Sequence, residues 1–515
     1  MRVTVRITAI VVALSCATIT VVGWAAPTVA TRSGPVAGVI EDGVLAFKGI
    51  PYAAPPTGAM RWRPPQPVQS WKEPLDATRY GASCPQPPRR DRAGEAGTSD
   101  ESCLFLNVWT KALDGRRPVM VWIHGGAFRL GSGAMPIYDG ARFAQRGVVL
   151  VTLNYRLGRF GFFAHPALAA ANPHDARGNY GLMDQAAALG WVKANVAAFG
   201  GDPDNVTVFG ESAGGASVLH LVTSPKTEGL FQKAIVESGG GHQLDRRLDA
   251  TRGTKQSLND QGVAWAKSVG AADVTALRAL TAQQVLGDGQ LSEGLGGVGP
   301  VIDGAWVTDD PGVLLAKGEF RHVPLLIGTN SYEASVLEAF GTDASRLLAT
   351  FGADSTALEK LYAGVSKDRT DLANQAFGDA TFVSGARHVA RSAAREAPVY
   401  LYHFDYVLER RRGNVPGAAH GAEIPYVFDA FGQLPKAVQL MTTQEDEAMA
   451  ATMNAYWVNF ASSGDPNGRG LPRWPRYSAD ADEWLLLRPK VEVIAKFRAP
   501  QLDFFQQRWE GVERQ

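Results

Sequence analysis

A serine framed by glycines follows an apolar run in this 515-residue chain. Residues 206–209 are β-branched or aromatic, as in a buried strand, and Gly210-Glu211-Ser212-Ala213-Gly214 follows directly before a run of small residues that opens a helix. A tight turn from strand to helix leaves no room for side chains beside the serine, so glycine is needed on either side. We predict that Ser212 projects its hydroxyl from the edge of a sheet as a nucleophile. The alternative is a glycine-rich turn with a solvated serine.

A serine hydroxyl is a poor nucleophile at neutral pH, so the site needs a base and an acid that orients that base. For a nucleophile in this kind of turn, the order along the chain is serine, acid, histidine. Of the nine histidines, His388, His403 and His420 lie late enough. The first lies in an amphipathic segment and the second in a strand-like run, which favours structural roles. We predict His420 as the base, because its loop of small residues (416–423) lets the ring approach a partner closely.

The acid is expected in the loop that follows the apolar run 324–328. Functional groups collect just past the carboxyl ends of strands in open α/β sheets, and Glu333 is the carboxylate best placed by that rule. Glu338, on the following helix, and Asp303, in a turn-like Asp-Gly, remain alternatives. We therefore predict that Glu333 fixes the tautomer of the base.

A glycine-rich loop follows the apolar run 119–123, with the sequence His124-Gly125-Gly126-Ala127-Phe128. Attack on an ester carbonyl develops a negatively charged oxygen, and hydrogen-bond donors must already point at it. The loop matches the oxyanion loop of esterases, so Gly126 and Ala127 would donate their N–H groups together with Ala213. A tight loop without a catalytic role is the alternative. Glu211 is expected to be a buried carboxylate that supports the electrostatics of the site, and a purely structural role is equally open.

Apolar runs of strand length alternate with helical patterns along the chain, which predicts an α/β fold with a mostly parallel, doubly wound sheet. The runs lie at 118–123, 148–153, 206–209, 234–236, 324–328 and 399–404, and the clearest helical patterns at 182–199 and 445–462. Two stretches, near 240–299 and 339–398, contain helical patterns but few strand-like runs. We interpret both as helical insertions that cap the active edge of the sheet.

The composition excludes several classes of partner. With 51 basic and 51 acidic residues and no long run of either sign, the chain has no electrostatic footprint for nucleic acid or an anionic membrane. It has no His-x-x-x-His or Cys-x-x-Cys pair and no phosphate-binding loop, so we predict no metal and no cofactor. The expected partner is a small-molecule substrate, and the oligomeric state cannot be predicted from the sequence.

The N-terminus has the pattern of an export signal, with Arg2 and Arg6 before the apolar stretch 7–22 and small residues after it. We predict a signal peptide at 1–25 and a secreted or periplasmic domain at 26–515. An uncleaved membrane anchor and a lipid attached to Cys16 are alternatives, and both leave the domain outside the cytoplasm.

An oxidising compartment explains the remaining two cysteines, which form an even pair. We predict a disulfide between Cys84 and Cys103, which closes a polar loop rich in proline, arginine and glycine. Two unpaired thiols are the alternative.

Taken in order, the motifs resemble those of type-B carboxylesterases, in the carboxylesterase and cholinesterase family, of the bacterial exported kind. The resemblance covers nearly all residues after the signal, and its further motifs are 47–53, 61–65, 101–108, Asn154-Tyr155-Arg156, 199–203, 300–304 and 459–467. It implies the α/β-hydrolase fold, the triad Ser212, Glu333 and His420, the oxyanion donors Gly126, Ala127 and Ala213, and the family's first disulfide at Cys84 and Cys103. It also implies an ion pair between Arg61 and Glu101, which we expect to be structural.

Two departures from the family pattern bear on the substrate. Cholinesterases hold a quaternary ammonium against a tryptophan in the first disulfide loop by cation–π contact, and the loop 85–102 has no tryptophan, so choline esters are not expected. The glycine cluster 294–299 occupies the stretch that shapes the acyl pocket in the family. We predict an open acyl side that admits bulky acids, although flexible glycines could equally let neighbouring side chains fill it.

The residues and the resemblance together predict a serine hydrolase that cleaves carboxylic esters through an acyl-enzyme intermediate. An amidase or lactonase with the same triad is one alternative, because these enzymes share the acylation chemistry. A non-catalytic adhesion module of the same fold is the other, although such modules usually lack the nucleophile.

Overall fold

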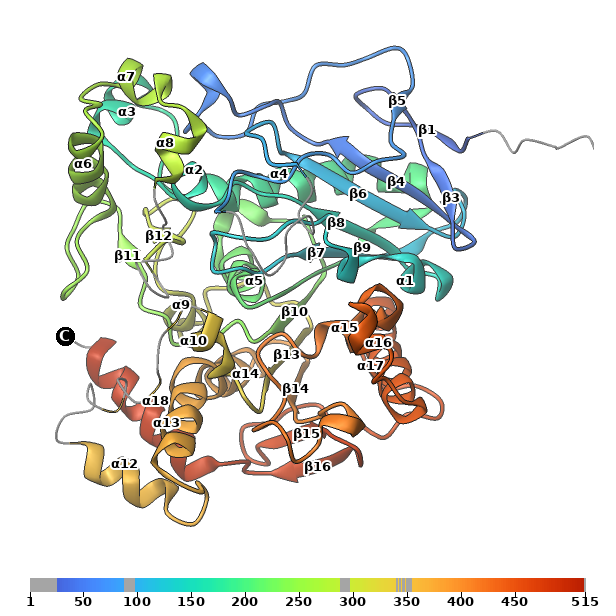
Figure 1. Ribbon diagram of the computed structural model, residues 1–515, viewed down its shortest axis with the longest axis vertical. Coiled ribbons are helices and arrows are strands. Elements are labelled where there is room, and N and C mark those ends of the chain that lie inside the picture. Colours follow the sequence, from blue (N-terminus) through green and yellow to red (C-terminus); the bar gives the residue numbers. More distant parts are fainter. Residues whose placement is uncertain are drawn as a thin grey trace, which may run out of the picture.

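The computed structural model describes residues 26–87, 98–287, 297–339, 341, 344, 348 and 354–513. Its centre is an 11-stranded sheet that crosses the whole molecule (Figure 1). In spatial order the strands are β16 (Glu492–Ala495), β15 (Glu483–Leu487), β14 (Val399–Phe404), β13 (Leu325–Asn330), β10 (Lys233–Glu237), β9 (Gly201–Glu211), β7 (Arg117–Ile123), β8 (Val149–Leu153), β6 (Phe105–Thr110), β4 (Val44–Pro51) and β3 (Val39–Glu41). The strands from β15 to β8 are parallel, and both ends of the sheet are antiparallel. The predicted mostly parallel sheet is confirmed.

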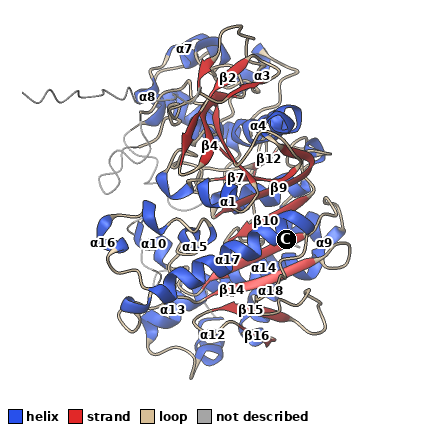
Figure 2. Ribbon diagram, turned by 90° about the vertical axis from the view of Figure 1, so that its right-hand side faces the viewer, coloured by secondary structure: helices blue, strands red, loops and turns tan. Residues whose placement is uncertain are grey.

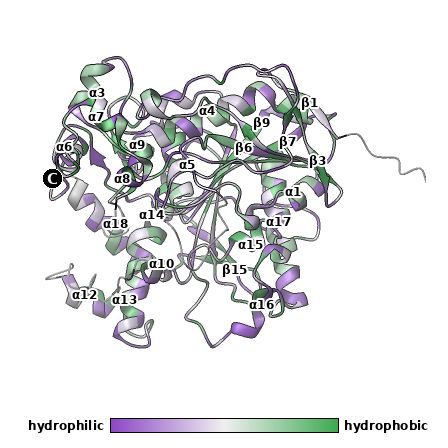
Figure 3. Cartoon of the chain, turned by 45° about the horizontal axis from the view of Figure 1, so that its top comes forward, coloured by the Kyte–Doolittle hydropathy of each residue, from purple (hydrophilic) through white to green (hydrophobic). Residues whose placement is uncertain are grey.

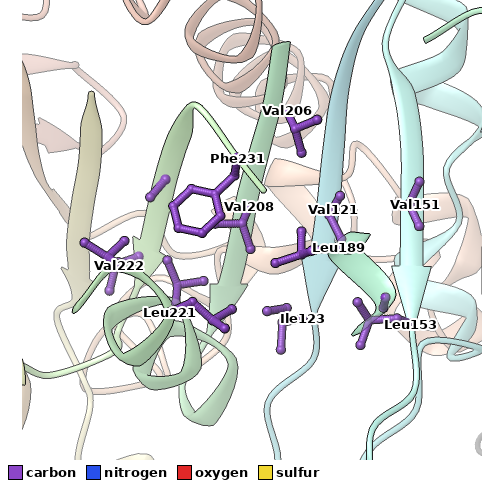
Figure 4. Packing of buried hydrophobic residues seen from close by; sticks show 14 of the residues in the cluster. Val121, Ile123, Val151, Leu153, Leu189, Val206, Val208, Leu221, Val222 and Phe231 are labelled. Carbon is purple, nitrogen blue, oxygen red and sulfur yellow. The ribbon is translucent and has the colours of Figure 1, made fainter. Parts of the chain in front are cut away.

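Alternate side chains of each central strand enter two different cores. Along β7, Val119, Val121 and Ile123 belong to one buried cluster, whereas Met120 and Trp122 belong to the other. This follows from the two-residue period of a strand, and burial of both faces explains why the strand reads as a continuous apolar run. Figure 4 shows part of the first cluster, with Val121 and Ile123 packed beside residues of β8, β9 and a neighbouring helix.

Helices cover both faces of the sheet (Figure 2). The first core contains side chains of α4 (Tyr180–Asn195), α5 (Ala213–Thr223), α9 (Pro311–Lys317), α14 (Ser384–Ala393) and α18 (Ala499–Glu513). The second contains side chains of α1 (Ala141–Gln145), α15 (Ile424–Val427) and α17 (Gln444–Ser463). Hydrophobic residues gather along the central strands, and the outlying helices carry both hydrophilic and hydrophobic residues (Figure 3). This three-layer arrangement is the doubly wound α/β architecture.

The two stretches interpreted as insertions contain the following elements. Residues 240–299 include β11 (Arg246–Arg247), α6 (Leu258–Ser268), α7 (Val274–Ala279) and α8 (Ala282–Leu286), and β11 pairs with β12 (Val301–Ile302). Residues 339–398 include α12 (Ser355–Tyr362), α13 (Arg369–Gly378), a single π-helical turn η7 (Asp379–Val383) and α14. Within the glycine cluster, Gly294 to Gly296 lie outside the described residues, as does the predicted signal peptide at 1–25.

The remaining strands and α-helices are short. They are β1 (Thr28–Ala30), β2 (Pro35–Ala37) and β5 (Leu75–Asp76), which form a separate three-stranded sheet, and α2 (Gly158–Gly161), α3 (Pro166–Ala171), α10 (Ser335–Ala339) and α16 (Lys436–Gln439). Among the helices that the structure describes, none has both the length and the apolar content that crossing a membrane requires.

Several elements differ in extent from the prediction. The strands β3, β4, β6, β15 and β16 were not predicted. In β4 and β6, polar residues such as Lys48 and Asn107 interrupt the apolar pattern. Strand β9 begins five residues before the predicted run 206–209, and β13 continues two residues past Gly328. The extension of β13 carries Thr329 and Asn330 to the edge of the sheet where the predicted acid follows.

Two predicted long-range pairs are present. Cys84 and Cys103 form a disulfide, with Cα atoms 4.9 Å apart and both side chains buried. The guanidinium of Arg61 pairs with Glu101 at 2.5 Å and also donates to the carbonyl of Leu280 at 2.7 Å, just before α8. The disulfide and the ion pair therefore fix the segments on either side of the polar loop.

Removal of the disulfide should destabilise the fold measurably. The bond joins residues 19 positions apart, and closing a loop of that size stabilises a folded chain by about 3 kcal/mol, chiefly through the unfolded state. The Cys84→Ala/Cys103→Ala double variant should lose about that much free energy of unfolding in a denaturant titration without reductant. Reductant should reduce the difference in free energy of unfolding between the two proteins, because it destabilises only the wild type. Equal stability of the two proteins without reductant would contradict the expectation.

Candidate active site

Ser212 lies at a sharp turn between β9 and α5. Its backbone has φ 56° and ψ −121°, a conformation that costs a non-glycine residue free energy and is maintained only by its surroundings. The helix begins so close to the neighbouring strand that a Cβ atom added at Gly214 would lie 2.0 Å from the carbonyl oxygen of Ile123. The glycine requirement deduced from the sequence therefore has a steric cause, and the turn has the form of a nucleophile elbow.

The glycine-rich loop after β7 packs directly on this elbow. A Cβ atom added at Gly125 would lie 3.1 Å from Cβ of Ser212 and 2.7 Å from the carbonyl oxygen of Glu211. Gly126, Ala127 and Phe128 have positive φ angles of 109°, 54° and 59°. Strands β7 and β9 are neighbours, but the chain passes through β8 on the far side of β7 between them. This is a topological switch point, where open α/β sheets bind their ligands.

His420 is hydrogen-bonded to Glu333. Nδ1 of the ring lies 2.5 Å from Oε2 of the carboxylate. The other carboxylate oxygen, Oε1, accepts from the Ser238 hydroxyl at 2.6 Å and from the Asn330 N–H at 2.7 Å. Because Glu333 is buried and receives these donors, its carboxylate is fixed in orientation.

The other two candidate acids form hydrogen bonds with other residues. Asp303 accepts from the N–H groups of residues 305–307 and from the Asn179 amide, which makes it a turn-forming residue. Glu338 accepts from the Tyr332 hydroxyl. Of the three carboxylates weighed from the sequence, Glu333 is the one that the structure brings to His420.

The two other late histidines have structural contacts. His388 lies on α14 with its Nε2 2.9 Å from the carbonyl oxygen of Gly312. His403 lies within β14 with its Nδ1 3.0 Å from the hydroxyl of Thr329. Both rings are buried, and burial lowers the pKa of each, so they are held as neutral parts of the core.

Glu211 connects the elbow with the histidine. Its Oε1 lies 3.2 Å from Nε2 of His420, and the side chain is buried. Burial raises the pKa of Glu211 to about 7, although the charge of His420 opposes the shift. Burial would lower the pKa of His420, but the Glu211 and Glu333 carboxylates outweigh it and raise that pKa to about 9. The two groups titrate as a pair. Since Glu211 immediately precedes Ser212, this contact also places the imidazole beside the elbow.

The sequence did not single out two further glutamates, Glu237 and Glu423. Glu237 ends β10 and accepts from the indole N–H of Trp457 at 2.8 Å, and Glu423 accepts from the side-chain amide of Asn330. Burial and the nearby Glu211 raise the pKa of Glu423 to about 8, and burial and the nearby Glu423 raise the pKa of Glu237 well above its ordinary value. Both shifts favour the protonated form of these carboxyl groups, which limits the negative charge near His420.

Two more residues near the site were also missed. Ser238, which binds Glu333, lies just past the end of β10, so the strand-end rule that found Glu333 could have found it as well. Phe382 lies on the π-turn η7 with its ring centroid 5.0 Å from that of His420. A π-turn cannot be recognised from a single amino-acid sequence, although such turns are frequent at functional sites.

A sequence model of the carboxylesterase family matches residues 25–505. The chain belongs to the carboxylesterase family. Fumonisin B1 esterase of Sphingopyxis macrogoltabida is 38% identical over 479 residues, which span 87% of this chain and 84% of that protein. Para-nitrobenzyl esterase of Bacillus subtilis is 36% identical over 480 residues, spanning 90% and 95% of the two chains.

Solved structures of carboxylesterases have the same fold. A PNB esterase aligns with a TM-score of 0.79 at 34% sequence identity and covers 93% of this chain and 99% of its own. A carboxylesterase of Geobacillus stearothermophilus aligns with a TM-score of 0.80 at 34% identity, covering 93% and 100%. The predicted α/β-hydrolase fold is therefore confirmed, and this carboxylesterase-family protein is a carboxylic ester hydrolase.

Proposed function

We propose that this hydrolase cleaves small-molecule carboxylic esters with a Ser-His-Glu triad through an acyl-enzyme intermediate. Ser212 is the nucleophile, His420 the general base and acid, and Glu333 the group that orients the imidazole. The observation that supports this assignment best is the bridging position of His420. Its Nδ1 bonds to Glu333 while its Nε2 lies 3.2 Å from the residue that precedes Ser212.

Acylation begins when the Ser212 oxygen attacks the ester carbonyl while Nε2 of His420 takes the hydroxyl proton. The new carbon–oxygen bond turns the carbonyl oxygen into an oxyanion, and Glu333 stabilises the imidazolium. The N–H groups of Gly126, Ala127 and Ala213 serve as donors to the oxyanion. This role requires the loop after β7 to pack on the elbow, and the two are in contact.

Collapse of this intermediate breaks the bond to the alcohol, which leaves with the proton that His420 returns. Deacylation repeats the sequence with water, whose proton passes to His420 while its oxygen bonds to the acyl carbon. Release of the acid restores the serine hydroxyl. In both halves the histidine must be neutral when attack begins.

A labelling experiment tests the assignment. A fluorophosphonate, which reacts with activated serines, should modify the wild-type protein at Ser212 and abolish ester hydrolysis in proportion to labelling. A panel of esters that varies the acyl and alcohol parts independently should then define the substrate. Full ester hydrolysis by stoichiometrically labelled protein, or labelling at another serine, would contradict the proposal.

The Glu211→Gln variant should shift the pH profile towards acid. The value of kcat/KM depends on neutral His420, so it rises as pH increases through the pKa of the His420–Glu211 pair. The substitution removes one carboxylate that raises the pKa of His420, so the rising limb should move down by about one pH unit. Hydrolysis of a neutral ester should be measured from acidic to alkaline pH, with the exposed Glu319→Gln as control. A limb that stays in place or moves up would contradict the expectation.

The described part of the glycine cluster borders the oxyanion loop. A Cβ atom added at Gly299 would lie 3.1 Å from the ring of Phe128, and the carbonyl of Gly297 accepts from Arg246 at 3.1 Å. If this side receives the acyl group, Gly297→Phe should lower kcat/KM for a bulky acyl ester about tenfold more than for the acetyl ester of the same alcohol. An equal loss for the two esters would count against an open acyl side.

We also propose that the protein works in an oxidising compartment, as a secreted or periplasmic enzyme. The disulfide between Cys84 and Cys103 supports this, because such bonds persist where thiols are not kept reduced. Intact-mass measurement after alkylation of the unreduced mature protein tests both parts. The measurement should find no alkylated thiol. The mass should equal that of the chain without its N-terminal segment.

A further inference from the structure

Gln86 joins the disulfide loop to the oxyanion loop with both ends of its amide. Its Nε2 donates to the carbonyl of Gly131 at 2.9 Å, and its Oε1 accepts from the N–H of the same residue at 2.9 Å. Nε2 also lies 3.1 Å from the carbonyl oxygen of Cys84. A side-chain amide that pairs with both backbone groups of one residue fixes that residue in position and in orientation.

Gly131 supports the segment that holds the oxyanion donors. It has φ 108°, and a Cβ atom there would lie 2.3 Å from Nδ1 of His124 and 2.7 Å from the carbonyl oxygen of Gly125. In between, the N–H of Leu130 donates to the carbonyl of Gly126 at 3.0 Å and closes the loop. The backbone that Gln86 binds therefore lies directly against the start of the oxyanion loop.

Asn154 holds the next two residues in a similar way. Its Oδ1 accepts from the Ser132 hydroxyl at 3.0 Å and from the Gly133 N–H at 2.8 Å, and its Nδ2 donates to the carbonyl of Ala82 at 2.9 Å. Asn154 follows β8, so it connects the end of the oxyanion loop to the sheet. Gln86 makes the corresponding connection to the disulfide loop.

The disulfide and the neighbouring prolines fix Gln86 itself. It is two residues from Cys84, which is bonded to Cys103 just before β6. Pro85 and Pro87 flank it, and proline restricts both its own φ and the residue before it. The amide therefore extends from a short segment with little backbone freedom that is covalently tied to the sheet.

We propose that Gln86 is a positioning residue, which transmits the constraint of the Cys84–Cys103 disulfide to the oxyanion loop through Gly131. The inference rests on the proposed role of Gly126 and Ala127 as oxyanion donors. Gln86 touches none of the reacting atoms in this scheme. Its effect is to keep the donor N–H groups at the place where the charge develops.

The expected effect is on kcat. Donors in an oxyanion hole act in the transition state, so misplacing them lowers kcat and leaves KM nearly unchanged. A displacement of the donors by about 1 Å lowers kcat about 10²-fold. Because Asn154 would still hold the loosened loop, we expect kcat to fall about tenfold. The loss should be similar for esters with large and small acyl groups, because every ester forms the same oxyanion.

The principal variant is Gln86→Met, which keeps the length of the side chain and removes both hydrogen bonds to Gly131. Ser99→Ala is the matched control, since Ser99 lies in the same disulfide loop and its hydroxyl donates to the carbonyl of Cys84 at 3.5 Å. We expect a kcat about tenfold lower in Gln86→Met with unchanged KM, and wild-type kinetics in the control. A wild-type kcat in Gln86→Met, or an equal loss in the control, would overturn the proposal.

Hydrogen exchange gives a readout that does not depend on catalysis. The Gly131 N–H loses its acceptor in Gln86→Met, so peptides covering 124–133 should exchange faster than in the wild type or in Ser99→Ala. If exchange accelerates but kcat does not change, the loop is held by Gln86 but the proposed oxyanion role of the loop is wrong. If exchange does not change, the positioning role of Gln86 is wrong whatever the kinetics show.

A double-mutant cycle connects the effect with the disulfide. The Cys84→Ala/Cys103→Ala variant should lose kcat to a similar degree below its unfolding temperature, and adding Gln86→Met should cost little more. If the two changes instead lower kcat independently, so that their factors multiply, the disulfide does not act through Gln86. Fluorophosphonate labelling of each variant at Ser212 would verify that the nucleophile is intact throughout.

Discussion

Replacing Ser212 by alanine should lower kcat by about 10⁴- to 10⁶-fold and leave the fold intact. The substitution removes the atom that forms the bond to the acyl group, so in the proposed scheme hydrolysis would require direct attack by water. Glu333 and His420 would keep their hydrogen bond, because neither depends on the serine hydroxyl. The remaining rate would come from substrate binding and from the donors of the oxyanion loop.

Steady-state hydrolysis of an activated ester measures this loss, and fluorophosphonate labelling should disappear in parallel. Ser268→Ala, an exposed serine on α6, is the matched control and should behave as the wild type. Thermal unfolding of Ser212→Ala should be unchanged or shifted upwards, since the residue has a strained backbone that alanine tolerates no worse. Turnover at the wild-type rate would exclude Ser212 as the nucleophile.

The elements of the site that could be predicted from sequence are those set by local rules. The turn at Ser212 follows from sterics within five residues, and Glu333 follows from the rule that functional groups lie past the ends of strands. The apolar runs predicted the inner strands because burial on both faces leaves no polar position. The outer antiparallel strands, such as β4 and β6, alternate less regularly and were missed.

Contacts between distant segments could not be predicted in the same way. Ser238 reaches Glu333 because β10 lies between β9 and β13, and that strand order is a property of the folded sheet. Gln86 reaches Gly131 across 45 positions for a similar reason. The burial of Glu237 and Glu423 is harder still to foresee, because glutamate is almost always exposed unless it has a partner. Their partners, Trp457 and Asn330, are on other elements.

Replacing Glu333 by glutamine should lower kcat by about 10⁴-fold with little change in KM, because it reverses the tautomer of the base. Oε1 of Glu333 accepts from the Ser238 hydroxyl and the Asn330 N–H, so the amide oxygen of a glutamine would take that place. Its NH₂ group would then face Nδ1 of His420 and donate to it. The ring proton would have to move to Nε2, which could no longer accept the proton of Ser212.

The same substitution distinguishes Glu333 from Glu338, another of the candidate acids. Glu338→Gln is the matched control, because Glu338 lies five residues further along the chain and accepts from Tyr332, away from His420. It should retain wild-type kcat, whereas Glu333→Gln should also show a lower pKa for His420, since one of the carboxylates that raise it is gone. That shift can be followed through the ring proton signals of the histidine by NMR, independently of turnover.

A kcat within tenfold of the wild type in Glu333→Gln, or an equal loss in Glu338→Gln, would show that Glu333 does not orient the base. A large loss of kcat without the pKa shift would instead indicate that the substitution disrupts the buried hydrogen bonds around Ser238 and Asn330.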